Sequence, residues 1–318
     1  MVSKGKINIG VHIPPEGKSF EEMKKYVQTA EKLGFDLFTI TDHFLNMKNP
    51  RGETNHPLEC WTTLAGLAAT TKTIYLAPLV SCAYYRLPTV LAKMATTIDI
   101  ISGGRFILGL GAGWLKEEFE SFMGGFPSAR ERLDALEDAA IICRDMFRRG
   151  ACTYHGKKFS AINALNRPRP VRVDIPIMIG AKGEKRALKI AAKCADIIHI
   201  TGFPTIQIAE HKIEVVKKHC RYVGRNFREL LLGIGLVVML HEDEGKIEEY
   251  AQNLSKSKGI SVEEARKFAH NSAGPKNIAN LIREFNKRGI ELFTLPGLSI
   301  EDMKMFAEEV LPKLHRSH

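Results

Sequence analysis

An aspartate and a histidine, Asp42 and His43, directly follow the apolar segment 36–41. Neighbouring residues on an extended strand face opposite sides, so one side chain can enter a site while the other anchors the chain. A histidine in that position can donate a hydrogen bond to a ring carbonyl or move a proton near neutral pH. Acid–base chemistry at His43 is therefore the first hypothesis, and a structural hydrogen bond at the end of a strand is the alternative.

A glycine-dense stretch, residues 103–114, offers a second kind of site. Residues 105–110 are too few for a free-standing helix and predict a short buried strand. Gly109, Gly111 and Gly113 lack side chains where the backbone is expected to leave this strand. Glycines at such an exit let a planar or anionic ligand approach the main chain, and a tight turn without a ligand is the alternative. A dinucleotide fingerprint fits poorly, because the spacing here is G-x-G-x-G rather than G-x-G-x-x-G.

Two further stretches could face a ligand. Residues 180–183, Gly-Ala-Lys-Gly, begin an expected helix, and the free amides of a helix N-terminus beside a lysine suit a phosphate. That signal is weak alone, because glycines begin many helices. Pro78 lies in an expected central strand, where it lacks a hydrogen-bond donor. It predicts an irregular backbone between residues 77 and 82, or a strand that begins only after the proline.

The sequence does not indicate a metal site. His12, His199, His211 and His219 do not form a ligand set at metal-binding spacing. The six cysteines are scattered and contain no C-x-x-C pair, which predicts a reduced cytoplasmic protein without a zinc or disulfide framework. Glu118 belongs to an acidic cluster beside the glycines, where it could orient the loop or begin a solvated helix.

The composition is that of a globular protein that binds a small molecule. Hydrophobic residues make up 44% of the 318 residues and charged residues 26%, and no apolar run is long enough to span a membrane. The net charge of +10 is spread among carboxylates without a nucleic-acid-binding signature. We therefore expect no nucleic-acid or membrane partner, and part of this charge could attract an anionic cofactor or substrate.

Strand and helix patterns alternate along the chain. The expected strands are residues 7–13, 36–41, 74–80, 105–110, 175–179, 196–202, 230–240 and 290–295. The expected helices are residues 19–33, 58–71, 87–101, 130–147, 180–195, 206–222, 275–288 and 300–314. Eight βα units of this length predict an α/β fold, a closed (β/α)8 TIM barrel, with the active site at the carboxyl ends of the strands. We expect one domain over residues 1–318, with insertions at about 150–174, an excursion or hairpin, and 241–271, which is helical.

The ends of these strands resemble those of the bacterial-luciferase-like oxidoreductases. The residues that carry the resemblance are Thr41-Asp42-His43, Tyr85-Arg86-Leu87-Pro88 with Ala92, Ser102-Gly103-Gly104-Arg105-Phe106 running to Gly113-Trp114 and Glu118, and Gly180 to Gly183 followed by Ala195-Asp196. This family splits into users of flavin mononucleotide (FMN) and users of the deazaflavin coenzyme F420. Luciferase-type members tend to have Glu-His-His after the second strand, whereas Asp-His resembles the F420 branch, which includes methylenetetrahydromethanopterin reductase.

The resemblance implies an F420-type ring across the mouth of the barrel and a cis non-prolyl peptide near Leu79–Val80. It also implies a phosphate beside Ala181, Lys182 and Gly183. The full set of cofactor contacts it implies is Thr41, Asp42, Leu79, Val80, Cys82, Gly111, Ala112, Gly113, Trp114, Gly180, Ala181, Lys182 and Gly183.

The resemblance also assigns roles in catalysis. His43 would form a hydrogen bond with the coenzyme ring or act as acid and base. Asp42 would position the coenzyme or the histidine, and Trp114 would form part of the wall of the substrate pocket. Glu16 lies where the sugar-phosphate branch has a functional carboxylate and is a further acid–base candidate. Trp114 stands where that branch has another carboxylate, which argues against glucose-6-phosphate as substrate. A second departure from the family pattern is that Lys182 and Glu184 stand where small residues or proline are usual.

The predicted function is hydride transfer between F420 and an organic substrate. The alternative is an FMN-dependent monooxygenase that uses oxygen, and a third hypothesis is a non-catalytic flavin-binding or nucleic-acid-associated protein. A homo-oligomer, a dimer or larger, is expected from the family.

Overall fold

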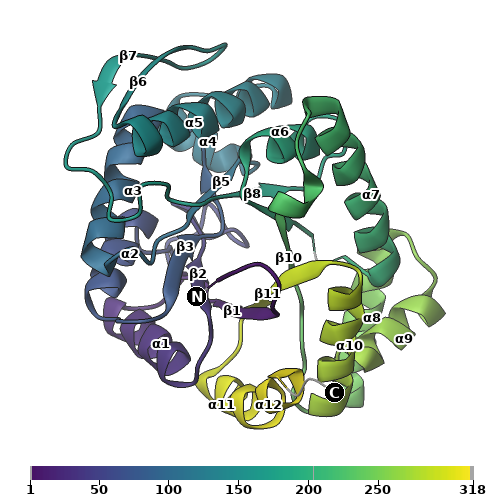
Figure 1. The fold of residues 1–318 in the computed structure, drawn as a ribbon. Helices are drawn as coiled ribbons and strands as arrows, with labels where there is room; N and C mark the ends of the chain where they lie inside the picture. Colours follow the sequence, from purple (N-terminus) through teal and green to yellow (C-terminus); the bar gives the residue numbers. More distant parts are fainter. Residues whose placement is uncertain (1, 203, 316–318) are drawn as a thin grey trace.

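Parallel strands form a ring at the centre of the computed structural model, which describes residues 2–202 and 204–315 (Figure 1). The strands are β1 (Asn8–His12), β2 (Leu37–Ile40), β3 (Tyr75–Pro78), β4 (Ser81–Cys82), β5 (Leu108–Gly111), β8 (Ile177–Ala181), β9 (Ile197–Ile200), β10 (Leu231–Gly235) and β11 (Ile290–Pro296). They pair in the order β3-β2-β1-β11-β10-β9-β8-β5-β4. A parallel bridge between Leu76 of β3 and Phe106, which precedes β5, closes the ring, so the predicted parallel barrel is confirmed.

The third strand of the barrel is broken, as Pro78 predicted. β3 ends at Pro78, the peptide between Leu79 and Val80 is cis, and β4 resumes at Ser81. The cis non-prolyl peptide stands at the position that the family resemblance implied.

Helices form the outer layer of the barrel (Figure 1). Their bounds are α1 (Phe20–Lys32), α2 (Cys60–Ala69), α3 (Pro88–Ser102), α4 (Lys116–Met123), α5 (Ala129–Arg149), α6 (Ala187–Cys194), α7 (Ile206–Val223), the 3-10 turn η1 (Phe227–Glu229), α8 (Glu244–Lys258), α9 (Val262–Asn271), α10 (Pro275–Lys287), α11 (Ile300–Glu309) and α12 (Leu311–His315). In α1, Ser19 forms a capping box with Glu22, and the buried Met23, Val27 and Ala30 recur at helical spacing.

Both predicted insertions are present, and several element boundaries differ from the prediction. The first insertion is an antiparallel hairpin of β6 (Ala151–His155) and β7 (Ser160–Leu165), and the second is the helix pair α8 and α9. The strand expected over 230–240 ends at Gly235, after which Met239 bridges to Ala273. The helix expected from residue 180 begins only at Ala187, and the closing helix is split at Val310.

The side chains that fill the interior of the barrel change from apolar to polar along the strands. One layer is apolar and consists of Leu37, Tyr75, Ala77, Ile107, Met178, Ile197, Leu231 and Leu292. Two residues further along, on the same inward face, the strands carry Thr39, Gly109, Gly180, His199, Gly233 and Thr294. The carboxyl end of the barrel therefore combines polar side chains with positions that have no side chain.

Gly109 and Gly111 of the glycine-dense stretch lie within β5, and Gly113 follows β5 where the chain leaves the strand. A Cβ on Gly109 would lie 1.9 Å from the carbonyl oxygen of Pro78, and one on Gly111 would lie 2.5 Å from Cγ2 of Val80. Gly113 has a φ of +74° and leaves room for the Cys82 thiol. Close approach of the broken third strand therefore accounts for these glycines, and their contact with a ligand stays a prediction.

Replacement of Gly109 by alanine tests this packing. Because the obstacle is a main-chain carbonyl rather than a flexible side chain, we expect Gly109→Ala to lower the free energy of unfolding by at least about 3 kcal/mol in urea titrations. Gly183→Ala is the matched control, because a Cβ there would meet nothing closer than the Ala187 methyl at 3.8 Å. Equal stability of the two variants would contradict the packing argument.

In the part of the chain that the structure describes, none of the helices is both long and apolar enough to cross a bilayer.

Candidate active site

Asp42 lies buried directly after β2 and is fully engaged by its own chain. Arg86 donates from both terminal nitrogens to the two carboxylate oxygens, at 2.6 and 3.0 Å. The Ser81 hydroxyl also donates to this carboxylate, and the Trp61 indole N–H lies 3.4 Å from it. Bidentate arginine pairing of a desolvated carboxylate fixes geometry firmly. Asp42 therefore anchors the chain at the end of β2. It was predicted to position either the coenzyme or His43, and these contacts favour the second role.

His43 is held by a second buried carboxylate, that of Glu118 in α4. Nδ1 of the imidazole lies 3.0 and 3.1 Å from the Glu118 oxygens, which also accept the amides of Phe44 (2.7 Å) and Leu45 (3.0 Å). The Tyr85 hydroxyl donates to the same carboxylate at 2.6 Å. Of the two interpretations left open for Glu118, orientation of the loop is the one that the structure supports.

The Glu118 carboxylate is ionised in this setting. Burial acts to raise its pKa, but the hydrogen bond and charge of His43 and the donors Tyr85 and Leu45 bring the pKa below its usual value. An ionised carboxylate only accepts hydrogen bonds, so Nδ1 of His43 carries a proton. Nε2 is therefore the nitrogen of His43 that Glu118 does not hold.

Two more histidines, His12 on β1 and His199 on β9, line the carboxyl end of the barrel. His12 Nδ1 lies 3.0 Å from the Thr39 hydroxyl, and His199 Nε2 lies 2.9 Å from the Thr294 hydroxyl. Burial lowers the pKa of His12 to about 4 and that of His199 to about 3, and the charge of His43 contributes to the first shift and that of His12 to the second. Both imidazoles are therefore neutral near pH 7.

The hydroxyl partners fix which nitrogen of each ring carries the proton. Thr39 donates to the Val11 carbonyl and Thr294 to the Ile234 carbonyl, so each hydroxyl accepts from its histidine. The second nitrogen of each neutral ring is then an acceptor. Nδ1 of His199 is such an acceptor, and it is buried without a partner among the described residues.

Other buried polar atoms at this end also lack partners within the described residues. They are both carboxylate oxygens of Glu16 and the hydroxyl of Thr41. Buried polar groups are nearly always hydrogen-bonded in folded proteins, so several at one place indicate a bound molecule. Glu16 and Thr41 were both predicted site residues.

An exposed aromatic surface adjoins His43. Trp114 is 60% exposed, and its ring meets the His43 ring edge-on at 5.7 Å between centroids. Phe122, 50% exposed, packs against Phe44 at 4.7 Å. Exposed aromatic rings beside a catalytic candidate can contact a substrate, as predicted for Trp114.

The remaining predicted contacts lie around Val80 and after β8. The Val80 side chain occupies the space beside Gly111 and Gly180, where Cβ atoms would come within 2.5 and 3.0 Å of it. Cys82 and Ala181 are buried, whereas Lys182 and Gly183 are exposed. The prediction that residues 180–183 begin a helix is wrong, because residues 184–186 form a turn and α6 begins at Ala187, whereas contact of residues 181–183 with a phosphate stays a prediction.

Comparison with known proteins identifies the family. The family model described as luciferase-like monooxygenase matches residues 6–306. The chain belongs to this family. The resemblance stated from the sequence is thereby confirmed, as is the expectation of an enzyme of the oxidoreductase class.

Relatives within this family carry out different reactions. The pyrimidine monooxygenase RutA of Pseudomonas savastanoi pv. phaseolicola is 34% identical over 194 residues, which are 59% of this chain and 52% of that protein. The chain thus matches about half the length of the curated relatives.

Two solved structures share the fold. One is the F420-dependent tetrahydromethanopterin reductase of Methanopyrus kandleri, with a TM-score of 0.80, 21% identity and coverage of 98% of this chain and 100% of that one. The other is the EDTA monooxygenase of Chelativorans sp. BNC1, with a TM-score of 0.80, 14% identity and coverage of 97% and 93%.

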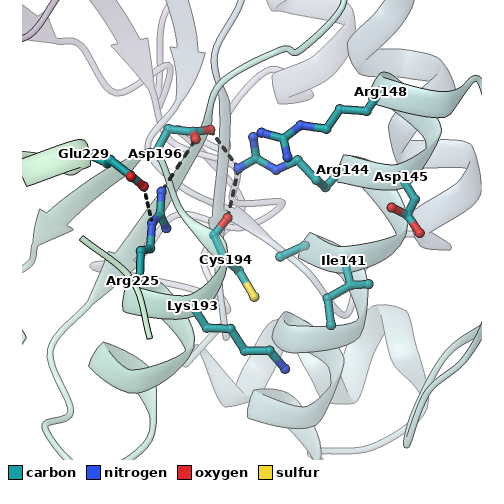
Figure 2. Close-up of a pocket in the computed structure, with 10 residues that line it drawn as sticks. Ile141, Arg144, Asp145, Arg148, Lys193, Cys194, Asp196, Arg225 and Glu229 are labelled. Atoms are coloured by element: carbon teal, nitrogen blue, oxygen red, sulfur yellow. Dashed lines mark hydrogen bonds and ion pairs between the residues drawn. The ribbon is translucent and has the colours of Figure 1, made fainter. Parts of the chain in front are cut away.

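A hollow of about 350 Å³ at the opposite, amino-terminal end of the barrel is lined by charged residues (Figure 2). Arg144 donates to Asp174 (3.0 Å), to Asp196 (2.7 Å) and to the Cys194 carbonyl (2.9 Å). Arg225 lies between Asp196 and Glu229. Because these charges are paired within the chain, the hollow is a structural ion network rather than a second candidate site. The described residues contain no group of three or more side chains placed to hold a metal ion.

The neutral state of His199 predicts a dependence of stability on pH. In the unfolded chain the His199 imidazole binds a proton below about pH 6.5, whereas in the folded chain it does so only near pH 3. The free energy of unfolding therefore falls as the pH is lowered through this range. His199→Gln should reduce the loss of unfolding free energy between pH 7 and 4 by on the order of 3 kcal/mol. Urea titrations at each pH measure this loss. His211→Gln, at an exposed site, should follow the unmodified protein, and identical pH profiles for all three would refute the assignment.

Proposed function

We propose that the chain is an F420-dependent oxidoreductase that transfers a hydride between the deazaflavin and an organic substrate. The observation that carries the proposal is the pair His43 and Glu118 at the carboxyl end of β2. Glu118 holds Nδ1 of the imidazole, which leaves Nε2 to exchange a proton with the ring or the substrate. When bound, F420 supplies a carbon centre that gives or accepts the hydride.

The residues at the mouth of the barrel fit a ring with a polar edge. Thr41, Glu16 and Nδ1 of His199 are buried polar groups without partners among the described residues. The last two are acceptors, so they suit N–H and O–H donors of a ligand. Trp114 and Phe122 would cover an apolar part of the substrate, and the ion pair of Asp42 with Arg86 keeps the loop that carries His43 in place.

Catalysis by an FMN-dependent monooxygenase is the second candidate. The observation that favours it is the 34% identity with pyrimidine monooxygenase over 59% of the chain. A deazaflavin has carbon in place of the nitrogen through which flavins react with oxygen, so the two candidates differ in chemistry. The small-molecule substrate, the homo-oligomer, the absence of nucleic-acid partners and the cytoplasmic location remain predictions.

Direct titration separates the two coenzymes. We expect F420 to bind with a dissociation constant at least about tenfold lower than that of FMN, which corresponds to about 1.4 kcal/mol. Quenching of ligand fluorescence on titration with protein measures both constants. Tighter FMN binding together with oxygen consumption would favour the monooxygenase instead.

A screen of pterins, alcohols and sugar phosphates first identifies a substrate that reduces F420. The rate of that reaction then tests the role of His43. His43→Ala should lower kcat by about 10² to 10⁴ while the dissociation constant of F420 changes little, because general acid–base catalysis supplies a factor of this size. Glu118→Gln should lower kcat through the lost orientation of His43, and Glu120→Gln, exposed on the same helix, should not. Unchanged turnover in His43→Ala would end the assignment.

A further inference from the structure

The coenzyme contacts that the family resemblance implies lie on one half of the barrel mouth. They belong to the ends of β2, β3, β4, β5 and β8, which are neighbours around the ring of strands. The other half consists of β9, β10, β11 and β1. It carries His199 on β9 and His12 on β1, and the resemblance assigns no role to either histidine. A substrate that meets the coenzyme at the mouth therefore has this second half available to it.

His199 extends across the inner face of the neighbouring strand. Strand pairing places it in register with Gly233 of β10, and its Nε2 reaches the Thr294 hydroxyl on β11, one strand further on, at 2.9 Å. Because Gly233 has no side chain, the imidazole can pass over it. The residue is only 4% exposed, and Nδ1 on the other side of the ring has no partner within the described residues.

His12 lies on the same half of the barrel and nearer the mouth. Gly10 of β1 pairs with Thr294, the residue that holds His199, and His12 is two residues further along the strand. Nδ1 of His12 is bonded to the Thr39 hydroxyl on β2, and its Nε2 forms no hydrogen bond in the part of the chain that the structure describes. The two rings are close enough that, after burial, the charge of His12 is the next cause of the lowered pKa of His199.

Both rings present a lone pair and no proton. Each is neutral near pH 7, since burial lowers the pKa of both, and each uses its only N–H on a threonine hydroxyl. The remaining nitrogen of each ring therefore accepts a hydrogen bond and cannot donate one. A carbonyl or carboxylate oxygen placed there would leave both acceptors unpaired, and sites built for a donor reject ligands that lack it.

We propose that His12 and His199 form an acceptor pair that receives hydrogen-bond donors of the substrate, so that the group facing the barrel interior carries N–H or O–H rather than an oxyanion. The substrate class is thus a neutral molecule with a cyclic amide or a hydroxyl group at this end. The assignment to the substrate rests on the proposed function, which places the coenzyme on the other half. The acceptor pair itself does not depend on which coenzyme binds.

Nitrogen-15 NMR of protein labelled at histidine observes the acceptors directly. In the free protein at pH 7 we expect the proton of His199 on Nε2 and that of His12 on Nδ1, and the variants His199→Leu and His12→Leu assign the resonances. The probes are two matched pairs: uracil with 1,3-dimethyluracil, and cyclohexanol with cyclohexanone. At least one donor-bearing probe should shift Nδ1 of His199 or Nε2 of His12, and its partner without a donor should not. Absence of any shift, or equal shifts within a pair, refutes the acceptor pair.

Kinetics with the substrate found in the screen separate substrate from coenzyme. His199→Leu should raise KM about tenfold, the effect of one lost hydrogen bond, while the dissociation constant of F420 stays the same. His219→Leu, on the outer helix α7, is the control and should leave both constants unchanged. An unchanged KM with F420 binding weakened about tenfold would overturn the assignment to the substrate.

Failure of the proposed function has a different signature. If neither F420 nor FMN binds but a donor-bearing probe still shifts the histidine nitrogens, the proposed coenzymes are rejected and the acceptor pair is supported. If F420 binds and reacts while no probe shifts these nitrogens and His199→Leu leaves KM unchanged, the proposed function is supported and the acceptor pair is refuted.

Discussion

The geometry of the candidate site depends on the burial of one carboxylate, that of Glu118. A buried charge is costly unless it is fully hydrogen-bonded, and Glu118 has no lysine or arginine partner among the described residues. It is stabilised instead by the imidazole of His43, by two amides of the chain after β2 and by the Tyr85 hydroxyl after β4. This requirement ties β2, β4 and α4 together and fixes the orientation of His43. The anchoring of Asp42 by Arg86 one residue earlier makes that arrangement rigid.

Much of this arrangement follows from local sequence patterns. Alternation of strands and helices predicted the barrel, and the position of Asp42 and His43 after a strand placed them at its carboxyl end. The sequence indicated that Glu118 could orient the loop, but its contact with His43 could not be predicted, because the two residues are 75 positions apart. Tertiary contacts of this kind leave no periodic signal.

The glycines show a different limit of sequence analysis. The sequence near the end of a strand contains glycine whether a ligand or another strand approaches the main chain there, so the sequence does not distinguish the two cases. Here Gly109 accommodates a main-chain carbonyl and Gly111 a valine side chain. His199 had a signal that could have been used, because strand pairing places it in register with Gly180 and Gly233. A large polar residue between two glycines inside a barrel indicates a side chain that extends across the interior.

The two ends of the barrel differ in how their charged and polar side chains are paired. At the amino end, Arg144 and Arg225 form ion pairs with Asp174, Asp196 and Glu229, so the charges that line the hollow are paired within the chain (Figure 2). At the carboxyl end, Glu16 and His199 have buried polar atoms without partners in the described chain. Buried polar groups are nearly always hydrogen-bonded, so the unpaired atoms of Glu16 and His199 suit a molecule from outside the chain, although unpaired atoms such as Oδ1 of Asp99 and Oε2 of Glu291 also occur elsewhere. The barrel fold places the expected active site at the carboxyl end. The unpaired acceptors there, on Glu16 and His199, call for a ligand that carries hydrogen-bond donors.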